Sequence, residues 1–492
     1  MQNPTPFLPG ISTRLYGRAQ RCRREKLREE LQLLQRHSLS RLGEIFGQWL
    51  PMDLFTPEAS GTNSRERTFP LSLTFWAFLS QVLDPGSACR EVVRKVQGWY
   101  VQHSRTMPGS GSGAYCQARQ RLPLKTLKTA HRKLADQLGA SPAPSGLWKG
   151  RRIRVVDGTG VSMPDTLENR KSSSRPSEQK PGCGFPVMKI VAVFCLQSGV
   201  LLHWIQGQLE EHECRLFTRL IQFFSPGDMV LADRGFSGYG QLAALWDQGV
   251  DSLMRLHAAR KIDWSQGERL GDQDRLMIWK KPDHRTQVFD PQVWADLPTA
   301  MTLRLVAITV SVPGFRTRHL TLVTTLLDAE RYPAQALGEL YFRRWSVEVF
   351  YRDIKQTMAM DILRCKSPEM IDKELVMHAI ADNLIRGLMQ EIAASCQVDL
   401  ARISFKGTLD ALRQWQPLFE AAPGGTRVSS KSVKLFYKIV AADPLILRPD
   451  RTEPRVVKRR PKNYRLLTKP RREMVVEPSR KQSQKPSKNP LI

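Results

Sequence analysis

Apolar residues recur along this chain with two different periods, and the change from one period to the other predicts a boundary near residue 148. Before it the spacing is helical: Leu27, Leu31 and Leu34 form one apolar stripe on a charged segment. From Arg152 onward the pattern is that of strands, turns and two helices. The predicted strands cover 152–157, 187–196, 200–208, 228–233 and 251–256, and the predicted helices cover 212–224 and 239–247. This β-β-β-α-β-α-β order predicts an α/β fold with a mixed sheet whose parallel strands are joined by crossover helices.

The strand pattern changes again at residue 257. Two further apolar runs, at 299–312 and 319–327, flank Pro313-Gly314 and predict a β-rich insertion over 257–330. Helical spacing returns at residue 331. The prediction is therefore a helical, basic region (1–148), an α/β core in two parts (149–256 and 331–395), the insertion between them (257–330), a helical C-terminal region (396–450) and a disordered basic tail (451–492).

Charge indicates what this fold binds. The 492 residues include 75 Lys and Arg against 47 Asp and Glu, a formal net charge of +28, and the tail at 451–492 is itself strongly basic. Such an excess favours a polyanionic partner, with nucleic acid as the first expectation and an anionic membrane surface as the alternative. The longest apolar stretch, 71–83, is shorter than the ~20 residues that span a bilayer. We therefore expect a cytoplasmic, nucleoid-associated protein in which 71–83 is a buried helix.

Two short helical patterns, at 114–121 and 124–138, are separated by Leu122-Pro123. They carry the basic residues Arg119, Arg121, Lys125, Lys128, Arg132 and Lys133. A helix-turn-helix reader of DNA and a helical bundle with a solvated basic face both fit this pattern, and both interpretations stay open.

The eight cysteines are scattered and include no C-x-x-C pair, which excludes a zinc ribbon and gives no disulfide framework. His212 and Glu213 match part of a zinc-deaminase signature, but the P-C-x-x-C that completes it is missing. We interpret both as surface residues of a helix.

Two aspartates end predicted strands of the sheet. Asp157 closes the first strand and Asp233 the fourth. Binding sites of open α/β sheets form at the carboxyl ends of strands, so these carboxylates lie side by side if the two strands are neighbours. Two such carboxylates need a cation between them, and hard oxygen ligands suit Mg²⁺ or Mn²⁺. Taken singly, an Asp before Gly at a strand end is also a common turn former.

A third pattern lies downstream, in Tyr341-x2-Arg344-x3-Glu348-x6-Lys355. On a straight helix these four side chains fall within a sector of roughly 60°. The predicted core stripe beside them is Val347, Phe350, Tyr351, Ile354 and Met358. By charge pattern alone a solvated helix edge is an equal interpretation. With the two aspartates, however, the set suits phosphodiester chemistry: three carboxylates for two metal ions, and Arg and Lys for phosphates.

Together these motifs resemble those of a known protein family. DGT at 157–159, LADRGF at 231–236 and the Y-x2-R-x3-E-x6-K at 341–355 resemble the DDE transposases of bacterial insertion sequences, specifically the insertion-sequence family 4 group. The resemblance covers about 150–395 and implies an RNase H-like core with a β-rich insertion. It also implies that Asp157, Asp233 and Glu348 bind two Mg²⁺ ions, with Mn²⁺ as a substitute.

The same resemblance implies that Tyr341, Arg344 and Lys355 contact DNA at the element end. In some relatives a Trp of the insertion holds a flipped base; Trp279 and Trp294 are the candidates here, and a core position is the alternative for both. The implied activity is hydrolytic nicking of the element's terminal repeats, then attack of the freed 3′-OH on target DNA, by a homodimer in a synaptic complex.

Two other functions share this fold. One is a domesticated or inactive DNA-binding descendant, and the other is an RNase H-like nuclease or resolvase without strand transfer. If the carboxylates are misassigned, the substitutes are Asp165 for Asp157, Asp228 for Asp233 and Asp353 for Glu348.

Overall fold

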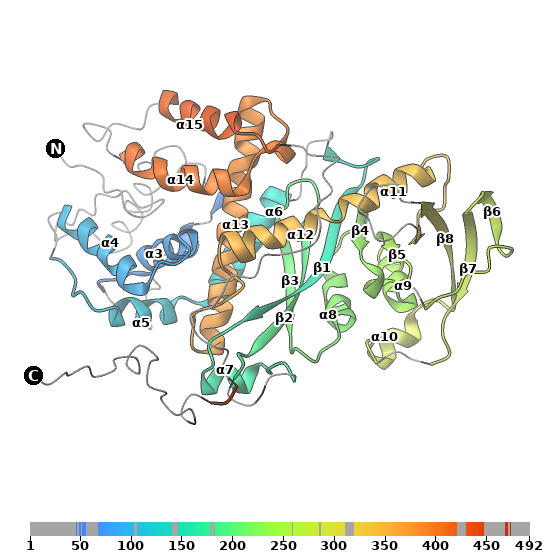
Figure 1. Cartoon of the computed structure of the whole chain (residues 1–492), viewed down its shortest axis with the longest axis horizontal. Helices are drawn as coiled ribbons and strands as arrows, with labels where there is room; N and C mark the ends of the chain where they lie inside the picture. The colour runs from blue at the N-terminus through green and yellow to red at the C-terminus, as the bar shows by residue number, and fades with distance from the viewer. Residues whose placement is uncertain are drawn as a thin grey trace, which may run out of the picture.

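The structure is a computed structural model of the whole chain, shown in Figure 1. It describes residues 46, 49–50, 52–55, 67–102, 106–139, 146–177, 180, 183–257, 259–284, 287–309, 319–420, 430–446, 468–470 and 473. The predicted stripe of Leu27, Leu31 and Leu34 and nearly all of the tail at 451–492 lie outside these residues. Within them, no helix is long and apolar enough to cross a bilayer.

One mixed sheet runs through the molecule in the order β3-β2-β1-β4-β5-β9-β8-β7-β6. Its strands are β1 (Arg152–Ser162), β2 (Val187–Cys195), β3 (Leu201–Gly207), β4 (Asp228–Ala232), β5 (Asp251–Arg255), β6 (Glu268–Gly271), β7 (Asp274–Lys280), β8 (Ala300–Thr309) and β9 (His319–Thr324). β1, β2 and β3 pair antiparallel, and β4 and β5 run parallel to β1. The first five strands therefore have the RNase H-like order, which confirms the predicted fold class.

Alternation along the strands places apolar residues on both faces of this sheet. In β1, Val155 belongs to one buried cluster and Val156 to the other, as period 2 requires. The cluster with Val155 is closed by α11 (Ala334–Arg343) and α12 (Ser346–Arg352). The cluster with Val156 is closed by α8 (Glu213–Leu220) and α9 (Tyr239–Asp247). The sheet is therefore covered on both faces, which explains the near-continuous apolar runs of β2 and β4.

The strand predicted to end at Asp157 continues to Ser162, so that boundary was wrong. The parallel pairing of β1 with β4 is recorded up to Val155, but its antiparallel pairing with β2 goes on to the pair Ser162–Val187. β2 therefore supplies hydrogen bonds to the part of the β1 backbone that lies beyond its pairing with β4. Gly158 inside this stretch, which suggested a turn, is extended strand instead.

Helices from both ends of the chain join at one side of the sheet, around the long helix α13 (Pro368–Cys396) (Figure 1). They are α3 (Leu71–Leu83), α4 (Cys89–Gln102), α5 (Gly113–Arg121), α6 (Leu124–Gly139), α14 (Phe405–Glu420) and α15 (Ser430–Ala442). The prediction of a buried helix over 71–83 is confirmed by α3. The break at Leu122-Pro123 is confirmed by α5 and α6; α6 buries Leu127 and Leu134 and leaves a basic outer face.

The segment predicted as β-rich holds β6 to β9 and α10 (Pro291–Asp296). Its strands extend the central sheet, because β9 pairs antiparallel with β5. Arg304 of β8 is fully buried; its guanidinium binds both carboxylate oxygens of Asp274 at 2.8 and 2.5 Å and the carbonyl of Tyr332 at 2.7 Å. Tyr332 lies just before α11, so this contact joins the outer strands to the start of the helix that carries Tyr341.

Candidate active site

The register of two parallel strands places Asp157 beside Asp233. β1 and β4 are neighbours, and their pairing ends with Val155 opposite Leu231. Two residues further along each strand are the two aspartates. Each is fixed by backbone: Gly158 N–H donates to Asp157 Oδ1 at 2.9 Å, and Gly235 N–H donates to Asp233 Oδ1 at 2.6 Å. The condition that the sequence left open, that these two strands are neighbours, is therefore met.

The pKa of the Asp157 carboxyl reflects the charged groups around it. The pKa of this carboxyl is raised to about 6: burial is the largest cause, the Gly158 N–H and Arg344 oppose the rise, and Asp233 and Glu213 add to it. Asp157 is thus a half-buried carboxyl surrounded by like charge and one guanidinium. A carboxylate pair of this kind attracts cations.

The segment with Tyr341 and Lys355 is not one straight helix, so the predicted 60° sector was wrong. α11 ends at Arg343, a turn follows at Arg344 and Trp345, and α12 begins at Ser346. A π-helical turn, Asp353–Thr357 (η5), then carries Lys355. Tertiary contacts hold the part after the break: Tyr351 and Lys355 bond to β1, and Asp353 pairs with Arg386 of α13.

Two of those ties fix α12 along β1. The Tyr351 hydroxyl donates to the backbone carbonyl of Asp157 at 2.7 Å. Lys355 Nζ donates to Thr159 Oγ1 and to the Gly160 carbonyl, both at 2.8 Å. Glu348 lies three residues before Tyr351, about one helical turn, and is exposed. The strand that carries Asp157 thus also positions the helix that carries Glu348.

Tyr341 and Arg344 enter the same region from α11 and the turn. Both are buried, and the Arg344 guanidinium lies 5.8 Å from the centre of the Tyr341 ring. Burial raises the pKa of the Tyr341 hydroxyl, and Asp233 adds to the rise. Arg344 Nε is buried without a hydrogen-bond partner among the described residues. An unsatisfied guanidinium donor beside two aspartates is suited to an incoming phosphate oxygen.

Sequence reasoning missed Glu213. We interpreted it as a surface residue, but it begins α8 half-buried against β1: a Cβ built on Gly158 would lie 2.6–2.8 Å from the atoms of its carboxyl group. The missing side chain of Gly158 therefore makes room for a further carboxylate. The only signal in the sequence was the His212-Glu213 pair, which nothing local connects to Asp157.

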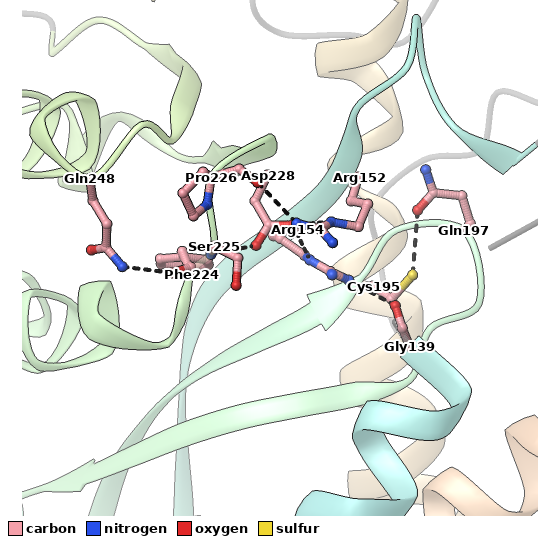
Figure 2. A network of polar contacts seen from close by, with 10 residues as sticks. All are labelled: Gly139, Arg152, Arg154, Cys195, Gln197, Phe224, Ser225, Pro226, Asp228 and Gln248. Carbon is pink, nitrogen blue, oxygen red and sulfur yellow. Dashed lines mark hydrogen bonds and ion pairs between the residues drawn. The ribbon is translucent and has the colours of Figure 1, made fainter. Parts of the chain in front are cut away.

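The three substitute carboxylates are all engaged elsewhere. Figure 2 shows Asp228 held by Arg152 and Arg154, at 2.8 and 3.1 Å, at the opposite end of β4 from Asp233. The remaining contacts are Asp165 with Arg170 (3.1 Å) and Arg175 (2.7 Å), and Asp353 with Arg386 (3.3 Å). Carboxylates that already neutralise arginines are poor candidates for a metal site.

The two tryptophans lie in the core, apart from this site. Trp279 of β7 is buried under the guanidinium of Arg260, 3.8 Å above its ring. Trp294 of α10 is buried against Phe289, with ring centres 5.8 Å apart. The structure therefore places both rings at core positions, the alternative that the sequence left open.

The donor atoms at the site fit a hard divalent cation. Asp157 and Asp233 offer carboxylate oxygens, and the nearby sulfur is protonated: burial, with Glu213 and Asp233, raises the pKa of the Cys214 thiol to about 11, and its Sγ donates to the Gly235 carbonyl. In the described part of the chain, no three His, Cys, Asp or Glu side chains are gathered closely enough to hold an ion.

Comparisons with known proteins give the chain's similarities. A family profile described as "Transposase DDE domain" matches residues 148–384. The chain is 28% identical over 429 residues to the transposase InsG for insertion sequence element IS4 of Escherichia coli K12, an alignment that covers 85% of this chain and 92% of that protein. It is 27% identical over 224 residues to the putative transposase InsZ of the same organism, covering 44% and 73%. A structure of the piggyBac transposase synaptic complex with hairpin DNA aligns over 82% of both chains, with 10% identity and a TM-score of 0.39.

Proposed function

Because the chain belongs to the DDE transposases of insertion sequences, enzymes that act on DNA, we propose that it nicks the ends of its element and joins them to target DNA. The observation that carries this proposal is the β1–β4 register, which sets Asp157 beside Asp233. Hydrolysis at each end frees a 3′-OH, and that hydroxyl then attacks a phosphodiester of the target. One phosphodiester bond is formed for each one broken in the second step, so no external energy source is needed.

Asp157, Asp233 and Glu348 would hold two Mg²⁺ ions, or Mn²⁺ in their place, whose chemistry is to activate the attacking oxygen and stabilise the leaving one. Glu348 is exposed on α12, one turn from the contact of Tyr351 with the backbone of Asp157. Its exposure fits a ligand that joins the site when DNA is bound.

Arg344, Tyr341 and Lys355 would bind the DNA backbone. The free Nε of Arg344 can donate to a phosphate oxygen, and the Tyr341 hydroxyl, kept protonated by burial, can donate to another. Lys355 Nζ donates to the hydroxyl of Thr159, two residues after Asp157 on β1. From there its positive charge can bind a second phosphate of the DNA backbone. These three donors orient the scissile phosphate toward the aspartates.

The partner is double-stranded DNA, both the terminal repeats and the target, and the net charge of +28 favours it. Two element ends must be brought together, so we infer a homodimer in the synaptic complex. The place of action is the cytoplasm, at the nucleoid.

The test is a cleavage assay on DNA with the gene's own flanking ends, in Mg²⁺ or Mn²⁺. Wild type is compared with Asp157→Asn and with a control, Asp272→Asn, whose carboxylate is almost fully exposed far along the sheet. Cuts at the element boundary by wild type and control, and none by Asp157→Asn, are the expected result. Boundary cuts without joined products on a target plasmid would instead favour a nuclease, and tight binding without cuts a DNA-binding descendant.

A further inference from the structure

A cavity of about 240 Å³ lies apart from the aspartate pair, where the N-terminal helices meet α13. Its walls come from α3, from the loop 85–88 and the start of α4, and from Arg119 of α5. Met358 and Ala359 after the π-helical turn, the segment 364–365 and the first half of α13 complete them. Residues from three distant parts of the chain thus enclose one space.

Polar groups without partners line this cavity. Ser87 is 3% exposed and His378 5%, yet the Ser87 hydroxyl and His378 Nδ1 have no hydrogen-bond partner among the described residues. Arg119 Nε, also in the wall, is buried and unpartnered. Buried polar groups almost always have a partner, so three around one space indicate a ligand that supplies acceptors. The Nδ1 of a neutral histidine donates in one of its two tautomers.

The charge around the cavity selects an anion. Arg119 and Arg364 are both in the wall, together with one carboxylate, Glu374. The oxygens of Glu374 accept from the backbone N–H of Arg364 at 3.0 Å and of Cys365 at 2.9 Å, so that carboxylate is already engaged. Two guanidinium groups against one engaged carboxylate leave the space net positive.

The loop that forms the mouth is held in place on both sides. Residues 85–88 lead into the N-terminus of α4, where the Ala88 N–H donates to the Glu91 carboxylate at 2.6 Å, so this helix end is already capped and the arginines supply the positive charge. The loop is held by its Ser87 carbonyl, which accepts from Arg364 Nη1 at 3.0 Å and from Gln81 Nε2 at 3.2 Å. Gly86 and Ala88 are exposed, so the cavity opens to solvent beside a fixed backbone.

We propose that this cavity binds an oxyanion of the phosphate class, held by Ser87, His378 and Arg119 with Arg364 as the second positive charge. The anion is either free phosphate or a phosphate of the DNA backbone. The site goes beyond the proposed function, because it shares no residue with the cleavage site. The cavity is lined in part by Ala359, which has a left-handed φ of 58° and follows the π-helical turn that carries Lys355. An anion bound in the cavity would therefore contact both the N-terminal helices and the segment that follows Lys355.

The test is titration calorimetry of the full chain with inorganic phosphate at constant ionic strength, in the absence of DNA and of divalent metal. We expect one phosphate per chain, and about tenfold weaker binding in Ser87→Ala, because this variant cannot make the hydrogen bond to the charged ligand. The matched control is Ser80→Ala: its hydroxyl in α3 is equally buried and unpartnered but is not in the cavity wall. No heat with wild type at millimolar phosphate, or equal affinities for the two variants, would overturn the proposal.

A second measurement separates the two sources of the anion. If the natural ligand is a DNA phosphate, duplex DNA competes with inorganic phosphate, and Ser87→Ala also weakens duplex binding relative to Ser80→Ala. If the natural ligand is free phosphate, saturating duplex DNA leaves the calorimetric affinity for inorganic phosphate unchanged. In that case Ser87→Ala and Ser80→Ala bind duplex DNA with equal affinity. Either result supports the site, and neither depends on cleavage.

Discussion

The hydroxyl of Tyr351 donates a 2.7 Å hydrogen bond to the backbone carbonyl of Asp157. This contact joins residues 194 positions apart and ties the helix of Glu348 to the strand of the first aspartate. Because it uses the backbone of Asp157, it leaves the carboxylate of that residue available. The distance from α12 to β1 is therefore set independently of the groups proposed to do the chemistry.

Tyr351→Phe removes this bond and keeps the ring. We expect the free energy of unfolding to fall by about 1 kcal/mol, and cleavage to fall several-fold because α12 is less firmly placed. The control is Tyr239→Phe, which removes a similar 2.6 Å bond to the Pro298 carbonyl away from the site. Urea denaturation and the boundary-cleavage assay measure both effects; equal cleavage by the two variants would show that the Tyr351 bond is only structural.

Glu348→Gln should abolish cleavage and leave DNA binding intact or slightly stronger, because it removes one negative charge near the phosphates. Glu339→Gln, exposed on α11, removes the same charge at a distance from Asp157 and should cleave normally. Gel-shift titration and cleavage of the same duplex provide the two readouts. Loss of binding in Glu348→Gln would contradict its role as a metal ligand.

Gly158→Ala places a methyl group 2.6–2.8 Å from the Glu213 carboxyl atoms, so that side chain must move. Those atoms are the far end of a flexible, half-exposed side chain that can swing aside, so we expect the free energy of unfolding to fall by no more than about 1 kcal/mol. Gly160→Ala is the control in the same strand, since its Cβ meets nothing closer than Val187 Cγ1 at 3.4 Å. Shortening the neighbour in Gly158→Ala/Glu213→Ala should restore stability; no recovery would mean that Glu213 is not the obstacle.

Arg304→Met leaves the carboxylate of Asp274 buried without its guanidinium. Removing one partner of a buried ion pair costs about 3–5 kcal/mol, so we expect a large fall in the urea midpoint. Arg269→Met breaks the exposed Arg269–Asp272 pair of the same sheet region and should leave the midpoint unchanged. A small effect of Arg304→Met would indicate that water reaches Asp274.

Deleting residues 451–492 should weaken non-specific DNA binding and flatten its salt dependence, because that segment is rich in Lys and Arg. For each phosphate that the shortened chain no longer neutralises, the slope of log affinity against log salt becomes shallower by about 0.9 on duplex DNA. Fluorescence anisotropy across a salt series measures the slope for both proteins. An unchanged slope would show that the tail does not bind phosphates.

Some of this structure could be predicted because it depends on local pattern. The β-rich runs at 152–157 and 228–233 indicated buried strands, and the crossover pattern indicated parallel ones, so the aspartates at their ends would lie together if the two strands were neighbours. The helix over 71–83 followed in the same way from an apolar run too short for a membrane. The fixed spacing from Tyr341 to Lys355 identified the family without any knowledge of the geometry.

By itself, the sequence determined the strand segments, the positions of Asp157 and Asp233 at or near strand ends, and the family motifs, because each depends on pattern or spacing within a short segment. Only the tertiary structure decided that β1 and β4 are neighbours, that β1 continues to Ser162, that the helix breaks at Arg344, and that Glu213 fills the space over Gly158. These features depend on partners tens to hundreds of residues away. A side chain's type states which bonds it can make, but the folded chain decides which partner lies within hydrogen-bonding distance.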